Sequence, residues 1–129
     1  MKLCRFEHNG TTYFGSIKDE SVVVTTSDFT ILGPEYSLSE VRLLPPVEPT
    51  KIVCVGRNYA DHAAELGNEV PKQPLLFLKA PSAIIGPFDT IAIPDQSSQV
   101  EHEGELAIVI GRDCKNIPDD VEAAQYIRG

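Results

Sequence analysis

The sequence contains no tryptophan, one methionine and three cysteines among its 129 residues, and its lysines and arginines do not cluster. The cysteines are odd in number and widely spaced, without a C-x-x-C pair, which argues against a disulfide framework and against a structural zinc site. The formal net charge of -8 would repel nucleic acid and anionic membranes. We therefore expect a small-molecule partner, no nucleic acid and no membrane.

Long hydrophobic runs are also missing. No apolar stretch approaches the roughly 20 residues of a membrane span, and the opening MKLCRFE lacks the apolar segment of a signal peptide. We expect a cytoplasmic protein. The hydrophobic fraction of 42% and the charged fraction of 23% are typical of a globular chain, long enough for one domain or for a small module joined to part of a larger one.

Short β-strands separated by turn residues dominate the first part of the sequence, where we predict strands near residues 2–6, 11–17 and 21–25. Asn9-Gly10 predicts a hairpin, because both central residues of a type I′ turn need positive φ. Three strands bury little surface, so we expect this module to lean on the rest of the protein. The proline-rich segment 45–49 predicts a linker, and hence domains at 1–46 and 47–129.

After the linker, strand and helix patterns alternate with proline-rich loops. We predict strands at 51–55, 75–79 and 91–93, an acidic strand that runs from 101 through 110, a helix at 59–66 ended by Gly67, and a last helix from about 118 past 127.

Glu103 and Glu105 lie in the run EHEGE, which leads directly into LAIVI. If this segment is a strand, the two carboxylates share one side of it at the edge of a core. An unpaired carboxylate there costs several kcal/mol, and a bound hard cation with oxygen ligands would balance it. Mg²⁺, or Mn²⁺ or Ca²⁺, fits this donor type better than zinc. The alternative is a solvated acidic strand end.

Other candidate residues flank the predicted helix. His62 and Glu65 are three residues apart and therefore neighbours on one helix face, where the carboxylate could orient the imidazole as a general base. A surface histidine near a glutamate is the plainer alternative. Arg57 and Asn58, in the turn before the helix, could bind a substrate carboxylate or simply be solvated. Lys79, at the end of an apolar strand, could face an anionic substrate or extend to solvent.

Three motifs resemble the fumarylacetoacetate hydrolase family: VCVGRNYADH, LFLKAPS and HEGELAIVIG, in this order between about Lys51 and Gly129. The resemblance implies an α+β, mainly β fold, in which a small N-terminal β module precedes the first part of a mixed β-rich catalytic domain. It also implies the roles of single residues: Glu103 and Glu105 as metal ligands, His62 with Glu65 as the catalytic base pair, and Lys79 facing the substrate pocket.

Members of this family act on small 2-oxo or 2-hydroxy-enoic acids and acylpyruvates through an enolate. The resemblance therefore implies hydrolytic C–C cleavage, with isomerisation of 2-hydroxyhepta-2,4-diene-1,7-dioate or hydroxymuconate type, or oxaloacetate-type decarboxylation, as alternatives. A homodimer is also implied. A non-catalytic β-rich binding module is the remaining alternative. Since the family's next metal-binding carboxylate, an aspartate, lies downstream of the equivalent of Gly129, we expect weak metal binding and little activity from these residues alone.

Overall fold

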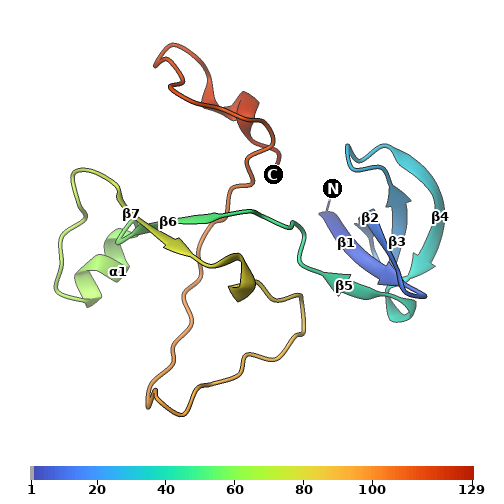
Figure 1. The fold of residues 1–129 in the computed structure, drawn as a ribbon, viewed down its shortest axis with the longest axis horizontal. Helices are drawn as coiled ribbons and strands as arrows, with labels where there is room; N and C mark the ends of the chain where they lie inside the picture. Colours follow the sequence, from blue (N-terminus) through green and yellow to red (C-terminus); the bar gives the residue numbers. More distant parts are fainter. Residues whose placement is uncertain (1) are drawn as a thin grey trace. The chain divides into compact units, whose positions relative to one another are not determined.

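The computed structural model describes residues 2–129, and its regular structure is mainly β, as the sequence predicts (Figure 1). By internal contacts the chain divides into two compact units, one that ends at Thr90 and one that comprises Ile91–Gly129. The boundary expected between residues 46 and 47 stays a prediction. Among the described residues, no helix is long and apolar enough to cross a membrane.

A five-stranded antiparallel sheet opens the first unit. In chain order its strands are β1 (Lys2–His8), β2 (Thr11–Lys18), β3 (Ser21–Thr25), β4 (Ile31–Ser37) and β5 (Arg42–Leu44), with a short 3-10 helix, η1 (Leu38–Glu40), before the last of them. In space the order is β4-β3-β2-β1-β5. The first three strands are confirmed. At the hairpin between β1 and β2, Asn9 and Gly10 have φ of 50° and 77°, as a type I′ turn requires.

The core of this sheet is small and dense. Phe6 and Val22 are completely buried, and Cys4 and Val24 pack with them. The Phe6 ring stacks on Tyr13 with a centroid separation of 5.5 Å. Gly15 lies beneath this cluster, and a Cβ there would lie 2.6 Å from Val22 Cγ2 and 2.7 Å from Phe6 Cε1. Phe6 and Val22 can therefore pack closely against β2 only because Gly15 has no side chain.

Two strands of this sheet, β4 and β5, are absent from the prediction. The Gly33-Pro34 pair within β4 is typical of a loop, but β4 is an edge strand, where proline removes no interior ladder bond. Only three residues form β5, too few for an alternating pattern to be read. The module is thus larger than the three strands expected.

The rest of the first unit contains β6 (Ile52–Gly56), α1 (Ala60–Glu65), β7 (Leu75–Lys79) and the 3-10 helix η2 (Pro81–Ala83). The two strands pair antiparallel as a separate two-stranded sheet, and α1 lies in the connection between them. The predicted bounds of β6, α1 and β7 are confirmed within a residue or two. A glycine at φ 67°, Gly67, follows α1, as predicted for a helix that ends in a left-handed residue.

The second unit, Ile91–Gly129, differs most from expectation. The strand predicted at 91–93 and the acidic strand predicted from 101 are wrong: the β pairing in this unit is limited to the isolated bridge between Ile110 and Ile127. A strand exists only when its backbone groups pair with a neighbour, and the described residues supply no neighbour here beyond that bridge. The last helix is also wrong. Only the 3-10 helix η3 (Ala123–Tyr126) forms, since a short helix without packing is marginal in water.

Candidate functional site

The predicted base pair lies on α1. Nδ1 of His62 is 3.7 Å from Oε2 of Glu65, with the imidazole about one third exposed and the carboxylate mostly exposed. The i,i+3 spacing accounts for this proximity, because such residues are neighbours on a helix surface. At 3.7 Å the two atoms are close neighbours but too far apart for a direct hydrogen bond. Ala63, on a different side of the helix, is buried and anchors α1.

The C-terminal end of α1 is closed by backbone hydrogen bonds. The amide of Asn68 donates to the carbonyl of Ala63 (2.8 Å), and the amide of Gly67 donates to the carbonyl of Ala64 (2.9 Å). This pair of bonds is a Schellman motif, in which the residue after the cap adopts a left-handed conformation. The motif fixes the last turn of a helix of only six residues, and with it the backbone that carries the base pair.

Arg57 joins the turn before α1 to the segment after it. Its Nη1 donates to Oδ1 of Asn68 (3.1 Å), and Nδ2 of Asn68 donates to the carbonyl of Leu66 (3.0 Å). Arg57 has φ 53°, a conformation that costs an L-residue roughly 1–2 kcal/mol. The structure thus gives Arg57 a bracing contact, which the sequence did not indicate. Its predicted role, and that of the neighbouring Asn58, in substrate binding stays a prediction.

Lys79 is the last residue of β7, where it is exposed and pairs across the sheet with Ile52. Gly56, which leads into α1, pairs with Leu75 at the other end of the hairpin. Four residues of strand at about 3.4 Å each separate the two ends by roughly 14 Å. The register therefore places the backbone of Lys79 at the end of the hairpin that is farther from the turn into α1.

Glu103 and Glu105 belong to the second unit, in a segment without regular secondary structure, and both are exposed. The common face that strand alternation would give them is therefore not formed. Their carboxylate oxygens are the donor type that Mg²⁺, Mn²⁺ and Ca²⁺ prefer, so the donor chemistry fits such an ion. Within residues 2–129, however, no three His, Cys, Asp or Glu side chains are grouped to hold a metal. The pair supplies only part of a coordination shell.

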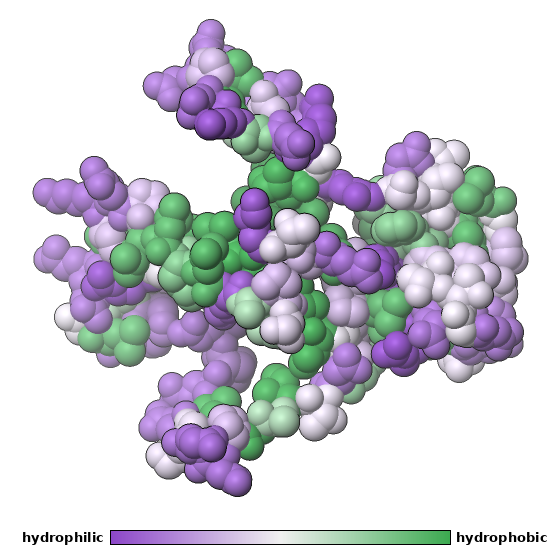
Figure 2. Space-filling model, in the orientation of Figure 1, coloured by the Kyte–Doolittle hydropathy of each residue, from purple (hydrophilic) through white to green (hydrophobic). Residues whose placement is uncertain are grey.

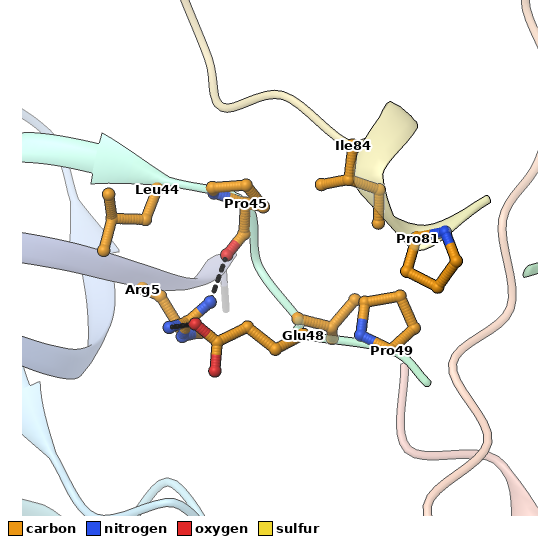
Figure 3. Close-up of a pocket in the computed structure, with 8 residues that line it drawn as sticks. Arg5, Leu44, Pro45, Glu48, Pro49, Pro81 and Ile84 are labelled. Carbon is orange, nitrogen blue, oxygen red and sulfur yellow. Dashed lines mark hydrogen bonds and ion pairs between the residues drawn. The ribbon is translucent and has the colours of Figure 1, made fainter. Parts of the chain in front are cut away.

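A cavity of about 360 Å³ lies beside the linker, and none of the predicted site residues lines it (Figure 3). Its cation is Arg5, whose guanidinium is buried and donates to Glu48 (2.5 Å) and to the carbonyl of Pro45 (3.2 Å). Pro81 and Ile84 form an apolar wall opposite. Because the charge of Arg5 is already balanced by Glu48, this cavity is not an anion site. No sequence pattern predicts this pair, because its members are 43 residues apart.

Within residues 2–129, the side chains with shifted pKa values are those of Cys4 and Asp28, and both lie outside the predicted site. Burial raises the pKa of the Cys4 thiol above its ordinary value. At the loop after β3, the Thr26 hydroxyl donates to Asp28 and, with the backbone amide of Thr30, lowers the pKa of that carboxyl. Both shifts belong to the N-terminal sheet and its loops.

Comparison with known proteins follows the two parts of the sequence. Residues 51–129 match the family described as fumarylacetoacetate (FAA) hydrolase C-terminal, and residues 1–46 match the family described as Rv2993c-like, N-terminal. A protein of Archaeoglobus fulgidus is 46% identical over 127 residues, which cover 98% of this chain and 48% of that protein. The mitochondrial oxaloacetate tautomerase fahd2 of Xenopus laevis is 46% identical over 94 residues, 72% of this chain and 29% of that enzyme.

Among solved structures, the 5-carboxymethyl-2-hydroxymuconate delta-isomerase of Mycobacterium smegmatis is similar with a TM-score of 0.80 and 42% identity. The match covers 98% of this chain and 51% of that enzyme. The chain thus spans about half the length, or less, of the relatives that it matches.

Proposed function

The chain belongs to the fumarylacetoacetate hydrolase family, and from this membership we propose that it contributes to an enzyme site that moves a proton next to the carbonyl of a small 2-oxo or 2-hydroxy-enoic acid. The observation that carries this proposal is the His62–Glu65 pair, because it supplies a proton acceptor with an adjacent carboxylate. The substrate class comes from the family, and the assignment of each residue to a role is part of the proposal.

The pair has a direct chemical use. A carboxylate beside Nδ1 favours the tautomer that carries its proton on Nδ1, which leaves Nε2 free of hydrogen and able to accept a proton from carbon. The same carboxylate stabilises the imidazolium that results. The separation of 3.7 Å is compatible with this role, since catalytic hydrogen bonds often shorten only when substrate is bound. Glu65 is then a positioning residue for His62.

Glu103 and Glu105 would hold a divalent cation, Mg²⁺ or alternatively Mn²⁺ or Ca²⁺, with further ligands from outside this pair. Such an ion, when bound, stabilises negative charge on the substrate oxygens. Arg57 and Asn58 are proposed to bind a substrate carboxylate, and Lys79 to face the developing oxyanion. Arg57 would have to exchange part of its contact with Asn68 for the substrate.

We propose isomerisation or tautomerisation as the reaction, because two similar proteins are an isomerase and a tautomerase. Both names describe proton transfer, which needs only a base and a stabilised enolate. Hydrolytic C–C cleavage, after which the family is named, and decarboxylation are the alternatives on the same enolate. A non-catalytic binding module would need none of these roles.

Calorimetric titration with Mg²⁺ and Mn²⁺, with and without oxalate as an enolate mimic, tests the metal assignment. We expect weak binding that Glu103→Gln and Glu105→Gln each remove. Glu101→Gln is the matched control, because it deletes a charge from the same acidic run and should leave binding nearly unchanged. If all three variants lose binding equally, the metal responds only to the negative charge of the acidic run, and the assignment of Glu103 and Glu105 as ligands is wrong. No heat in any of them would favour the non-catalytic module.

The role of His62 as the base is tested by measuring turnover of oxaloacetate, followed by the loss of its enol absorbance band in the ultraviolet. His62→Gln should slow any turnover by about 10²–10⁴, the usual contribution of a general base, while the circular dichroism spectrum stays unchanged. Glu65→Gln should lower kcat less and shift its dependence on pH, because it changes the environment of the base and leaves the base present. Undiminished turnover in His62→Gln would refute the role given to this residue.

A further inference from the structure

Asn68 connects the two ends of the segment that contains α1. Its backbone amide donates to the carbonyl of Ala63 (2.8 Å) and its Nδ2 donates to the carbonyl of Leu66 (3.0 Å), so both groups hold the C-terminal end of the helix. Its Oδ1 accepts from Nη1 of Arg57 (3.1 Å), in the turn before the helix. Because one end of the side-chain amide donates and the other accepts, these two partners fix its orientation. Figure 2 shows many hydrophilic residues at the surface in the region of α1.

The end of α1 that Asn68 holds is next to the predicted base pair. Glu65 is the last residue of the helix, and Leu66 is its C-cap. The last carbonyls of a helix lack partners within it, and Nδ2 of Asn68 supplies a partner for one of them. A helix of six residues is too short to be stable by itself, so bonds of this kind determine where it lies. The position of His62 therefore depends on contacts outside the helix, among them those of Asn68.

Arg57 is held in place by the same side chain. Its backbone lies in the left-handed region, at φ 53°, directly after the last residue of β6. An unfavourable conformation of this kind persists only where the surrounding structure maintains it. An arginine whose guanidinium is already hydrogen-bonded has also lost part of its rotamer freedom before a ligand arrives. The bond to Asn68 thus orders the cation in advance.

The partner of Arg57 is a neutral amide, which distinguishes it from the buried arginine of the N-terminal sheet. Arg5 pairs with the carboxylate of Glu48, which balances its charge. An amide oxygen orients a guanidinium and leaves its positive charge in place. The bond to Asn68 uses one of five N–H donors, and a carboxylate bound through two parallel hydrogen bonds needs only two of them. A substrate carboxylate therefore displaces part of this contact and not all of it.

We propose that Asn68 is a positioning residue for Arg57. Its neutral amide ties the guanidinium to the end of the helix that carries His62, so that a substrate carboxylate is bound at a fixed place relative to the base. This role rests on the proposed function, since it deepens the part given there to Arg57. It is assigned to an asparagine outside the three motifs of the sequence. Alanine at this position would release the guanidinium, and aspartate would hold it but neutralise it.

Nuclear magnetic resonance of the guanidinium tests the contact itself. Hydrogen exchange of the Arg57 side chain, assigned by the signal lost in Arg57→Lys, should be slower in the unsubstituted chain than in Asn68→Ala, because a hydrogen-bonded N–H is protected. Gln73→Ala is the matched control, since Gln73 is an exposed side-chain amide in the same connection between α1 and β7, and the exchange should stay slow in this variant. Equal exchange in the unsubstituted chain and in Asn68→Ala would overturn the proposal.

Titration with oxalate, without metal, tests the consequence for carboxylate binding, and the shift of the Arg57 signals reports the affinity. Asn68→Ala should weaken binding by roughly two- to tenfold, the range expected when one flexible side chain is no longer ordered in advance. Asn68→Asp should keep the exchange of Arg57 slow, because a carboxylate oxygen also accepts from the guanidinium. It should nevertheless weaken oxalate binding at least as much, because it balances the charge. Unchanged affinity in both variants would overturn the proposal.

A second control separates positioning from helix capping. Gly67→Ala loosens the same end of α1 and keeps the asparagine side chain, so it should weaken oxalate binding less than Asn68→Ala does. Equal weakening in the two variants, with an equal loss of the helical circular dichroism signal, would make Asn68 a helix cap and nothing more, and the proposal wrong.

The oxalate titration also distinguishes this role from the proposed function. Oxalate that binds at Arg57 with equal affinity in every Asn68 variant leaves the proposed function standing and refutes only the role of Asn68. No oxalate-dependent shift at Arg57 in any variant refutes both that role and the substrate-binding part given to Arg57. Because neither measurement uses metal or turnover, the outcome for His62 is independent of both.

Discussion

Gly15→Ala is the substitution for which the structure gives the clearest energetic consequence. The added methyl group would lie 2.6 Å from Val22 Cγ2 and 2.7 Å from Phe6 Cε1, far inside van der Waals contact. Both neighbours are completely buried, so neither can turn into solvent to make room. Overpacking of this kind costs about 1–3 kcal/mol. Alanine also reduces the entropy of the unfolded chain, which returns about 0.4–1 kcal/mol. We expect a net loss of about 1–2 kcal/mol.

Gly33→Ala is the matched control, because it makes the same chemical change in β4, where nothing lies within 4 Å of an added Cβ. Its effect should be neutral or slightly stabilising. Urea denaturation followed by tyrosine fluorescence measures both, since Tyr13 and Tyr36 pack against the core and the chain has no tryptophan. Equal unfolding midpoints for the two variants, or a more stable Gly15→Ala, would refute the account of the core.

Four further predictions each follow from a single structural feature. Burial raises the folded pKa of the Cys4 thiol above its ordinary value of 9.0. The contribution of this thiol to stability is therefore complete below pH 9.0 and is lost as the pH rises through the raised pKa. In Cys4→Ala, the stability measured by urea denaturation should fall less at alkaline pH. At neutral pH a thiol reagent should label exposed Cys114 before Cys4. Phe88, 98% exposed at φ 67°, should be replaceable by glycine with a gain of up to about 1 kcal/mol in thermal unfolding. Gly67→Ala should cost about 1 kcal/mol and speed hydrogen exchange in the last turn of the helix that carries His62.

Local chemistry was enough to predict much of the first unit. Asn9-Gly10 sets the first hairpin through its own backbone preferences, and Gly67 ends α1 in the same way. The proximity of His62 to Glu65 follows from helix geometry alone. Such features depend on residues close in sequence, so the pattern contains the necessary information.

Features that depend on distant partners could not be predicted. The run LAIVI has the composition of a core strand, but no described strand is available to pair with it, and Leu106, Ile108 and Ile110 are exposed. The predicted strand that would give Glu103 and Glu105 a common face is absent for this reason, and their role as metal ligands stays a prediction. The contact of Arg57 with Asn68 depends on how the chain returns after α1, which residue types alone do not specify.

The Arg5–Glu48 pair has a consequence for any attempt to isolate the N-terminal sheet. A polypeptide cut after residue 46 would lose Glu48 and leave an interior guanidinium with no counter-ion, while one extended through Pro49 would keep it. Gly86 also lies close to this region, since a Cβ on it would be 3.3 Å from the carbonyl oxygen of Leu43. The proline-rich segment is therefore held against the N-terminal sheet. A protease should cleave this segment less readily than the loops that follow it.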